Sequence, residues 1–135
     1  MDITIRKFED NYIIDVSGEI DMYNAFRLRE VVRGMMEKKI RIFILNLKKV
    51  SYIDSSGIGA LLSINAQLTQ ARRALRIVNV SAPVRHVMEL THLLGFLPIA
   101  GNELEAIESV AAQGRPAGEG APARGKVFEQ KGGRV

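Results

Sequence analysis

The sequence predicts an α/β domain with a mixed β-sheet. Two short runs near the start alternate apolar and polar residues, as half-buried strands do. A third run, residues 40–47, is almost continuously apolar and rich in β-branched residues, which is typical of a strand covered on both faces. Elsewhere apolar residues recur at spacings of three and four, as in amphipathic helices. This order favours a mixed sheet of four to five strands with about four helices.

The first half of the domain is predicted to form a hairpin and a helix. Residues 3–8 and 12–16 are the expected hairpin strands, with a turn-forming cluster at 9–11 between them and Ser17-Gly18 closing the second strand. Asp21 is a good N-cap for the helix that follows and ends at 37–39. Its expected buried stripe is Ala25, Leu28, Val31, Val32, Met35 and Met36.

The second half is predicted to contain three helices around one further strand. A helix over 56–72 should bury Ile58, Leu61, Leu62, Asn65 and Leu68. The next elements are a strand over 75–80, a helix with Pro83 in its first turn, a short edge segment over 96–99, and a helix capped by Asn102 that buries Leu104, Ile107 and Val110.

Composition separates a domain at 1–112 from a tail at 113–135. The tail is rich in Gly, Pro, Ala and basic residues, offers little to bury, and is expected to be disordered. It holds five basic and two acidic residues, so it accounts for +3 of the net charge of +4 and leaves the domain at +1. This near neutrality disfavours DNA binding by the domain.

Several chemical classes are disfavoured by what the chain lacks. Without cysteines it can form no disulfide or thiolate metal site, which is compatible with a reducing cytoplasm. Residues 1–8 are charged and alternating, unlike a signal peptide, and no apolar run approaches the roughly 20 residues of a membrane-spanning helix. We therefore expect a cytoplasmic protein with no membrane insertion, metal or cofactor of its own.

The most informative segment is residues 50–59, Val-Ser-Tyr-Ile-Asp-Ser-Ser-Gly-Ile-Gly. It joins the buried strand to a helix and places Asp54, Ser55 and Ser56 at the helix N-terminus, where free N–H groups and the positive end of the helix dipole gather. Its two glycines allow close packing of the helix start or close approach of another molecule's backbone. One interpretation is that Asp54 or Ser55 is simply an N-cap.

Two enzymatic interpretations find little support in this segment. A phosphate-binding loop would need the Gly-Lys-Ser/Thr ending or the Gly-x-Gly-x-x-Gly spacing, and neither is present. A serine hydrolase would need the Gly-x-Ser-x-Gly nucleophile elbow, which is also absent. The only histidines, His86 and His92, are six residues apart and do not form an i, i+4 metal pair. We therefore expect surface histidines and no catalytic site.

Two motifs at their observed separation resemble those of the STAS domain, specifically the bacterial anti-sigma factor antagonist (anti-anti-sigma) group. Gly18-Glu19-Ile20-Asp21 is similar to the Gly-Asp/Glu-hydrophobic-Asp motif of that family. Leu45-Asn46-Leu47 followed by residues 50–59 resembles the family signature almost residue for residue, and 91–96 resembles its later helix end loosely. The resemblance spans about 1–112 and implies a single STAS-like domain.

The resemblance also implies a non-enzymatic switch in transcription regulation known as partner switching. The unphosphorylated antagonist would bind an anti-sigma factor that is also a serine kinase using ATP and Mg, and so release a sigma factor. The kinase would phosphorylate Ser55, and a serine phosphatase would restore it. Asp21 and Asp54 would flank the phosphoacceptor, whereas the implied contact surface comprises Ser56, Gly57 and Ile58. From the residues themselves, Met22, Tyr23 and Phe26 could form the apolar part of an interface, although Phe26 equally suits the core.

Three questions stay open at this level. The partner could be a non-sigma target, such as a secretion or signalling phosphatase pathway, and a small hydrolase is the rival from another class. Arg72-Arg73 replaces a glycine often found before the next strand of the family, and marks either a different binding surface or a solvated turn. The basic tail is a tether, a weak contact with nucleic acid or anionic membrane, or passive chain.

Overall fold

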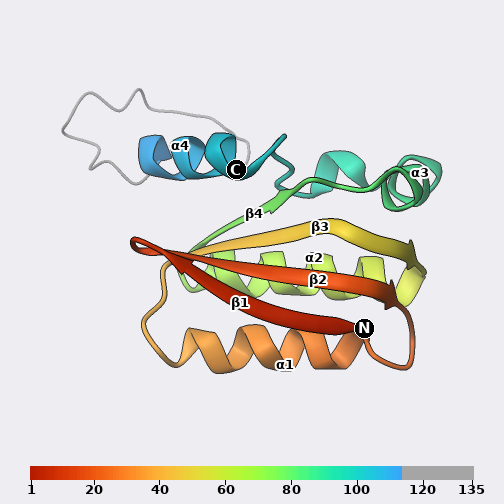
Figure 1. The fold of residues 1–135 in the computed structure, drawn as a ribbon, viewed down its shortest axis with the longest axis horizontal. Coiled ribbons are helices and arrows are strands. Elements are labelled where there is room, and N and C mark those ends of the chain that lie inside the picture. The colour runs from red at the N-terminus through yellow and green to blue at the C-terminus, as the bar shows by residue number, and fades with distance from the viewer. Residues whose placement is uncertain (114–135) are drawn as a thin grey trace.

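The computed structural model describes residues 1–113, with a four-stranded sheet in the order β1-β2-β3-β4 (Figure 1). β1 (Asp2–Phe8) and β2 (Asn11–Ile20) form the predicted antiparallel hairpin. β3 (Ile42–Ile53) pairs in parallel with β2, and β4 (Ala74–Val78) pairs in parallel with β3. Because β2, β3 and β4 are parallel, their carboxyl ends meet at one end of the sheet and their amino ends at the other.

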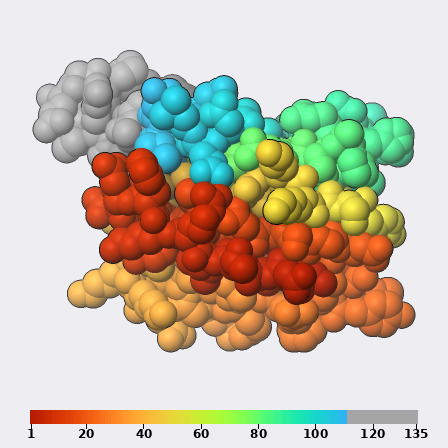
Figure 2. All heavy atoms as spheres, viewed as in Figure 1, coloured from red at the N-terminus to blue at the C-terminus, as the bar shows by residue number. Residues whose placement is uncertain are grey.

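Helices connect the parallel strands and cover the sheet on both sides. Figure 1 shows α1 and α4 on opposite sides of it, and the same view in Figure 2 shows β1 and β2 forming the exposed front of the molecule. The bounds are α1 (Ala25–Met36), α2 (Ser55–Gln70), α3 (Ala82–Leu90), a 3-10 turn (Leu94–Phe96) and α4 (Glu103–Gln113). The described residues contain no helix long and apolar enough to cross a membrane.

The prediction that β3 is covered on both faces is confirmed. Phe43, Leu45 and Leu47 belong to the main core, which also contains the buried stripes of α1 and α2. Ile44 points to the other face, where it joins a smaller cluster of buried residues with Ile13, Val78 and Ala106 of α4. A strand with apolar neighbours on both sides has no polar face, which is why its sequence does not alternate.

The two strands that precede Asp21 and Asp54 extend further than the hydrophobic pattern predicts. β2 ends at Ile20 instead of 16, and β3 ends at Ile53 instead of 47. The pairing of β2 with β3 shifts register around Ser17 and again after Gly18, whose φ is +91°. This irregularity interrupts the alternation that the sequence pattern depends on, so Ser17-Gly18 is a bulge inside the strand and not its end.

Several predicted positions in the helices need correction. α1 begins at Ala25, with Asn24 at the N-cap position, so Asp21 does not cap it. Ile64, not Asn65, lies in the fully buried stripe of α2, which begins one residue earlier than predicted. Leu104 is 66% exposed because Ala106 takes the buried position in α4.

The predicted fifth strand is reduced to a single bridge. Ile99 pairs with Ile77 in parallel, and the Ala100 N–H donates to the Ile77 carbonyl. The segment before it forms the 3-10 turn instead of a strand, and Pro98 lacks the N–H needed to extend the pairing. The predicted tail disorder concerns residues that lie outside the described part, which ends with α4 at Gln113.

Candidate functional site

The candidate site lies where β2 and β3 end side by side and their chains turn away. Ile20 and Ile53, the last residues of the two strands, are partners in the parallel pairing. The Asp54 N–H donates to the Ile20 carbonyl at 3.2 Å, which extends this contact by one residue. The two motifs that resemble the family signature therefore meet in space, although 32 residues separate Met22 from Asp54.

Asp54 is the central side chain of the site. One carboxylate oxygen, Oδ1, accepts from the Gly57 N–H at 3.0 Å, which makes Asp54 the N-cap of α2. The other oxygen, Oδ2, accepts from the Met22 N–H at 3.1 Å. A single carboxylate thus satisfies a free N–H at the helix start and holds the preceding loop against it.

Ser55 is left without a structural task by this arrangement. It is the first residue of α2, it is exposed, and its hydroxyl makes no hydrogen bond to any group among residues 1–113. The capping interpretation therefore applies to Asp54 and not to Ser55. The Ser55 hydroxyl is therefore exposed and makes no hydrogen bond within the described residues.

The loop from Asp21 to Asn24 is held by its own polar side chains. Asp21 Oδ1 accepts from the Tyr23 N–H at 2.9 Å, and Asn24 Oδ1 accepts from the Asp21 N–H at 2.9 Å. Asn24 Nδ2 also donates to the Glu19 carbonyl at 2.8 Å. Sequence reasoning did not single out Asn24, although asparagine and aspartate both favour turns because their side chains hydrogen-bond nearby backbone groups.

The helix start packs so closely on the strand ends that Gly57 has no room for a side chain. A Cβ placed there would lie 2.5 Å from Ile53 Cγ1 and 3.0 Å from the Ile20 carbonyl oxygen. Gly59 is different, because nothing lies within 4 Å of its would-be Cβ. Gly57 thus serves close packing within the chain, whereas Gly59 leaves open space on the surface.

The predicted contact residues divide into exposed and buried groups. Ser56 is exposed, but Gly57 is buried and Ile58 is only 1% exposed in the core beneath α2. In this conformation Ile58 therefore offers no side-chain surface to a partner. Its position supports the site from below, through packing.

Apolar side chains form one exposed border of the site. Met22 is 66% exposed, Tyr23 79% and Phe26 53%. The core interpretation of Phe26 is therefore wrong, since Ala25 and Leu28 take the buried positions of α1. Tyr52, which sequence reasoning did not single out, is also exposed, next to Glu19 in the strand pairing. Adjacent exposed apolar residues of this size are typical of protein interaction surfaces.

The polar part of the site is acidic. Glu19, Asp21 and Asp54 lie within the two strand ends and the loop, and none forms an ion pair with a basic residue in the described part of the chain. The positive end of the α2 dipole partly balances them. A further negative charge on Ser55 would therefore be added to a site whose carboxylates have no ion-pair partner in the described part of the chain.

Within residues 1–113, neither histidine lies in hydrogen-bond contact with Ser55. His86 lies exposed in α3, and His92 lies exposed just after it with φ of +59°, as predicted for surface histidines. Neither makes a hydrogen bond to Ser55. A search of residues 1–113 finds no group of histidine, aspartate and glutamate side chains that could hold a metal ion.

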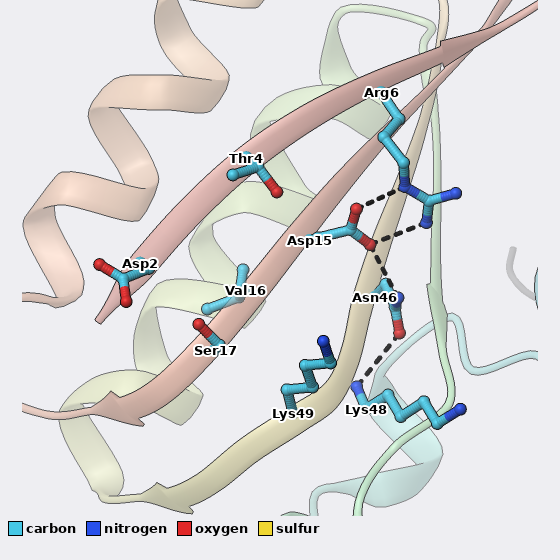
Figure 3. Close-up of a pocket in the computed structure, with 9 residues that line it drawn as sticks. All are labelled: Asp2, Thr4, Arg6, Asp15, Val16, Ser17, Asn46, Lys48 and Lys49. Atoms are coloured by element: carbon cyan, nitrogen blue, oxygen red, sulfur yellow. Dashed lines mark hydrogen bonds and ion pairs between the residues drawn. The ribbon is translucent and has the colours of Figure 1, made fainter.

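A polar cleft of about 430 Å³ lies elsewhere, on the face of the sheet against which α4 also packs (Figure 3). Arg6 of β1 pairs with Asp15 of β2 and with Glu103 of α4, and Asn46 of β3 donates to Asp15 at 2.8 Å. The hydrogen bonds from Arg6 lower the pKa of Asp15, assisted by the bond from Asn46 and opposed by desolvation. These interactions join three strands and α4, and they account for Arg6, Asp15 and Asn46 among the residues that line the cleft.

Comparisons with known proteins match both the fold and the motifs. A family model described as the STAS domain matches residues 2–106. A relative from Staphylococcus aureus (strain NCTC 8325 / PS 47), named anti-sigma-B factor antagonist, is 34% identical over 95 residues. That match covers 70% of this chain and 88% of the relative.

Solved structures with the same fold include one protein in two states. The anti-sigma factor antagonist SpoIIAA in its unphosphorylated form has a TM-score of 0.66 and 24% identity, over 82% of this chain and 96% of that one. The Bacillus cell fate determinant SpoIIAA in the phosphorylated form has a TM-score of 0.59 and 23% identity, over 81% and 99%. The fold of this chain is therefore shared with both states of that protein.

Proposed function

This chain belongs to the STAS domain family, and from that premise we propose that it is an anti-sigma factor antagonist controlled by phosphorylation of Ser55. In its unphosphorylated form it binds an anti-sigma factor that is also a serine kinase, and thereby releases a sigma factor. The kinase supplies ATP and Mg and inactivates the antagonist at Ser55, a serine phosphatase restores it, and the cycle takes place in the cytoplasm. The relative named anti-sigma-B factor antagonist supports this role.

The observation that carries the proposal is the difference in hydrogen bonding between Asp54 and Ser55. Asp54 caps α2 and holds the Met22 loop, while the neighbouring Ser55 hydroxyl is exposed and makes no hydrogen bond within residues 1–113. A phosphoacceptor must be reachable by a kinase. It must also be replaceable by a phosphoserine without loss of the fold, and the exposure of Ser55 and its lack of a hydrogen bond support both conditions.

Phosphorylation would act on the binding surface and not on the fold. A phosphoserine carries about −1.5 to −2 charges at neutral pH. At the first position of α2 the helix dipole would offset part of this charge, by about 0.3–1 kcal/mol. No protein hydrogen bond of Ser55 is lost, so the domain has no reason to unfold.

The same charge would strongly disfavour a partner packed over the site. Docking would have to desolvate the phosphate beside Asp54 and the acidic loop, whose carboxylates have no basic partner among residues 1–113. A loss of about 3 kcal/mol already weakens binding more than a hundredfold. One modification is therefore sufficient for release.

The contact surface that we propose combines the acidic and apolar parts of the site. Asp21, Ser56 and the exposed Met22 and Tyr23 contact the partner directly. Asp54 orients the loop that carries Met22. Gly57 and Ile58, which the family resemblance also implicates, contribute by letting the helix start pack on the strand ends.

A binding experiment tests this function. The partner kinase is first identified by co-purification from the native cell, which also distinguishes a sigma-factor pathway from a secretion or signalling phosphatase pathway. Its affinity is then measured by calorimetry for wild type, Ser55→Ala, Ser55→Asp and the control Ser63→Asp, an exposed serine further along α2.

We expect Ser55→Asp to weaken binding and Ser63→Asp to leave it unchanged. With the kinase and ATP, intact-mass analysis should add one phosphate to wild type and none to Ser55→Ala. Equal affinity of Ser55→Asp and wild type, or a phosphate mapped to another residue, would contradict the proposal.

A further inference from the structure

A cluster of basic residues lies at the end of the sheet opposite to Ser55. It is built from the turn between α1 and β3 and the turn between α2 and β4, at the amino ends of the parallel strands, where Ile42 pairs with Ala74. Figure 1 shows this end at the left, beside the β1–β2 turn. We call it the basic pole, and its members are Lys38, Lys39, Arg41, Arg72 and Arg73.

Hydrogen bonds hold the two turns together as one surface. Arg73 Nη1 donates to the Ile40 carbonyl at 2.9 Å, across 33 residues of sequence. The Ala74 N–H donates to the Arg41 carbonyl, also at 2.9 Å. Arg73 is therefore structural, and it fixes the other four basic residues relative to one another.

Those four side chains carry positive charge that no ion pair within the described residues neutralises. Lys38, Lys39, Arg41 and Arg72 are exposed, and none forms an ion pair with a carboxylate in the described part. Cations beyond a helix C-terminus are favoured by the helix dipole, which accounts for part of the cluster. It does not account for Arg41, which precedes a strand.

Two of the basic residues have a backbone conformation in which glycine would be less strained. Lys39 has φ of +58° and Arg72 has φ of +61°, both in the left-handed region. Arg72 occupies the position after the end of α2 where the Arg73 N–H donates back to the Leu68 carbonyl at 2.8 Å, a helix ending that usually uses glycine. Glu9 in the β1–β2 turn has a similar φ of +56°, so this conformation belongs to the turns at this end of the sheet and not to the basic residues alone.

We propose that the basic pole binds a short carboxylate-rich segment of another protein, at a site separate from Ser55. Acidic residues interrupt the surface, since Glu9 and Asp10 form the β1–β2 turn and Glu37 precedes Lys38. A continuous phosphate backbone or a flat anionic membrane would be brought against these carboxylates, whereas a short segment can lie between the two basic turns. Binding here does not depend on the state of Ser55.

The test measures binding of a fluorescein-labelled peptide of eight alternating glutamates and glycines to the full chain by fluorescence anisotropy at low salt. The pole variant Arg41→Gln/Arg72→Gln is compared with Lys48→Gln/Lys49→Gln, which removes the same charge from exposed residues of β3. We expect at least a tenfold loss of affinity in the pole variant and less than a twofold change in the control.

A second variant separates binding from stability. Arg72→Gly removes one charge and relieves the strained backbone. It should therefore raise the melting temperature by roughly 4 °C and still weaken the binding of the peptide. Equal losses in the pole and control variants would overturn the proposal. Tighter binding of a 20-base-pair DNA duplex or of phosphatidylserine vesicles than of the peptide, lost in the pole variant, would also overturn it and reassign the partner class.

Discussion

Replacing Gly57 by alanine tests the close packing on which the site depends. The added Cβ would lie 2.5 Å from Ile53 Cγ1 and 3.0 Å from both Ile20 Cγ2 and the Ile20 carbonyl oxygen. Contacts this short require movement, but Ile20 and Ile53 are fully buried and the carbonyl belongs to the backbone. The start of α2 must therefore move away from the strand ends.

The magnitude follows from two opposed terms. Overpacking in a buried site costs about 1–3 kcal/mol. Alanine is a better helix former than glycine by about 1 kcal/mol, and this gain is smaller in the first turn. We expect Gly57→Ala to lower the free energy of unfolding by about 1–2 kcal/mol and to disturb the hydrogen bond between Asp54 and the Gly57 N–H.

Gly59→Ala is the matched control, because it lies two residues along the same helix with open space around its would-be Cβ. Only the propensity term applies there, so the free energy of unfolding should rise by about 0.5–1 kcal/mol. Urea titration followed by circular dichroism gives the midpoint and slope for both variants. If both substitutions shift the midpoint in the same direction by similar amounts, the close packing described at Gly57 would be contradicted.

Two further predictions concern charged side chains. Asp54→Ala should lower the free energy of unfolding by about 1–2 kcal/mol through loss of the cap, and amide hydrogen exchange should accelerate at Met22. Asp54→Asn should retain much of the capping and serves as the control. An unchanged exchange rate at Met22 in Asp54→Ala would contradict the link between the two loops. Because Arg6 lowers the pKa of folded Asp15, the stabilisation is present above the unfolded pKa of about 3.9 and is lost as pH falls toward the folded pKa. Arg6→Leu should therefore flatten the fall of the melting temperature as the pH drops below the unfolded pKa of Asp15, and an unaltered curve would speak against this ion pair.

The sequence predicted the fold class and the composition of the site better than the edges of the elements. The apolar run of β3 and the buried stripe of α1 depend on local spacing, which can be recognised in the sequence without knowledge of tertiary contacts. The end of β2 was misplaced because the bulge at Gly18 interrupts alternation and is stabilised by pairing with β3, a contact that local spacing does not contain.

What the sequence determined by itself is the chemistry available at the start of α2. A carboxylate, two hydroxyls and a glycine follow a buried strand, and helix termini attract these residue types for local reasons of hydrogen bonding and backbone freedom. Only the tertiary structure decided how that chemistry is divided. Asp54 accepts hydrogen bonds from both the Gly57 N–H and the Met22 N–H because two parallel strands end side by side. Since Asp54 provides the cap and the link to the loop, the Ser55 hydroxyl is needed for neither.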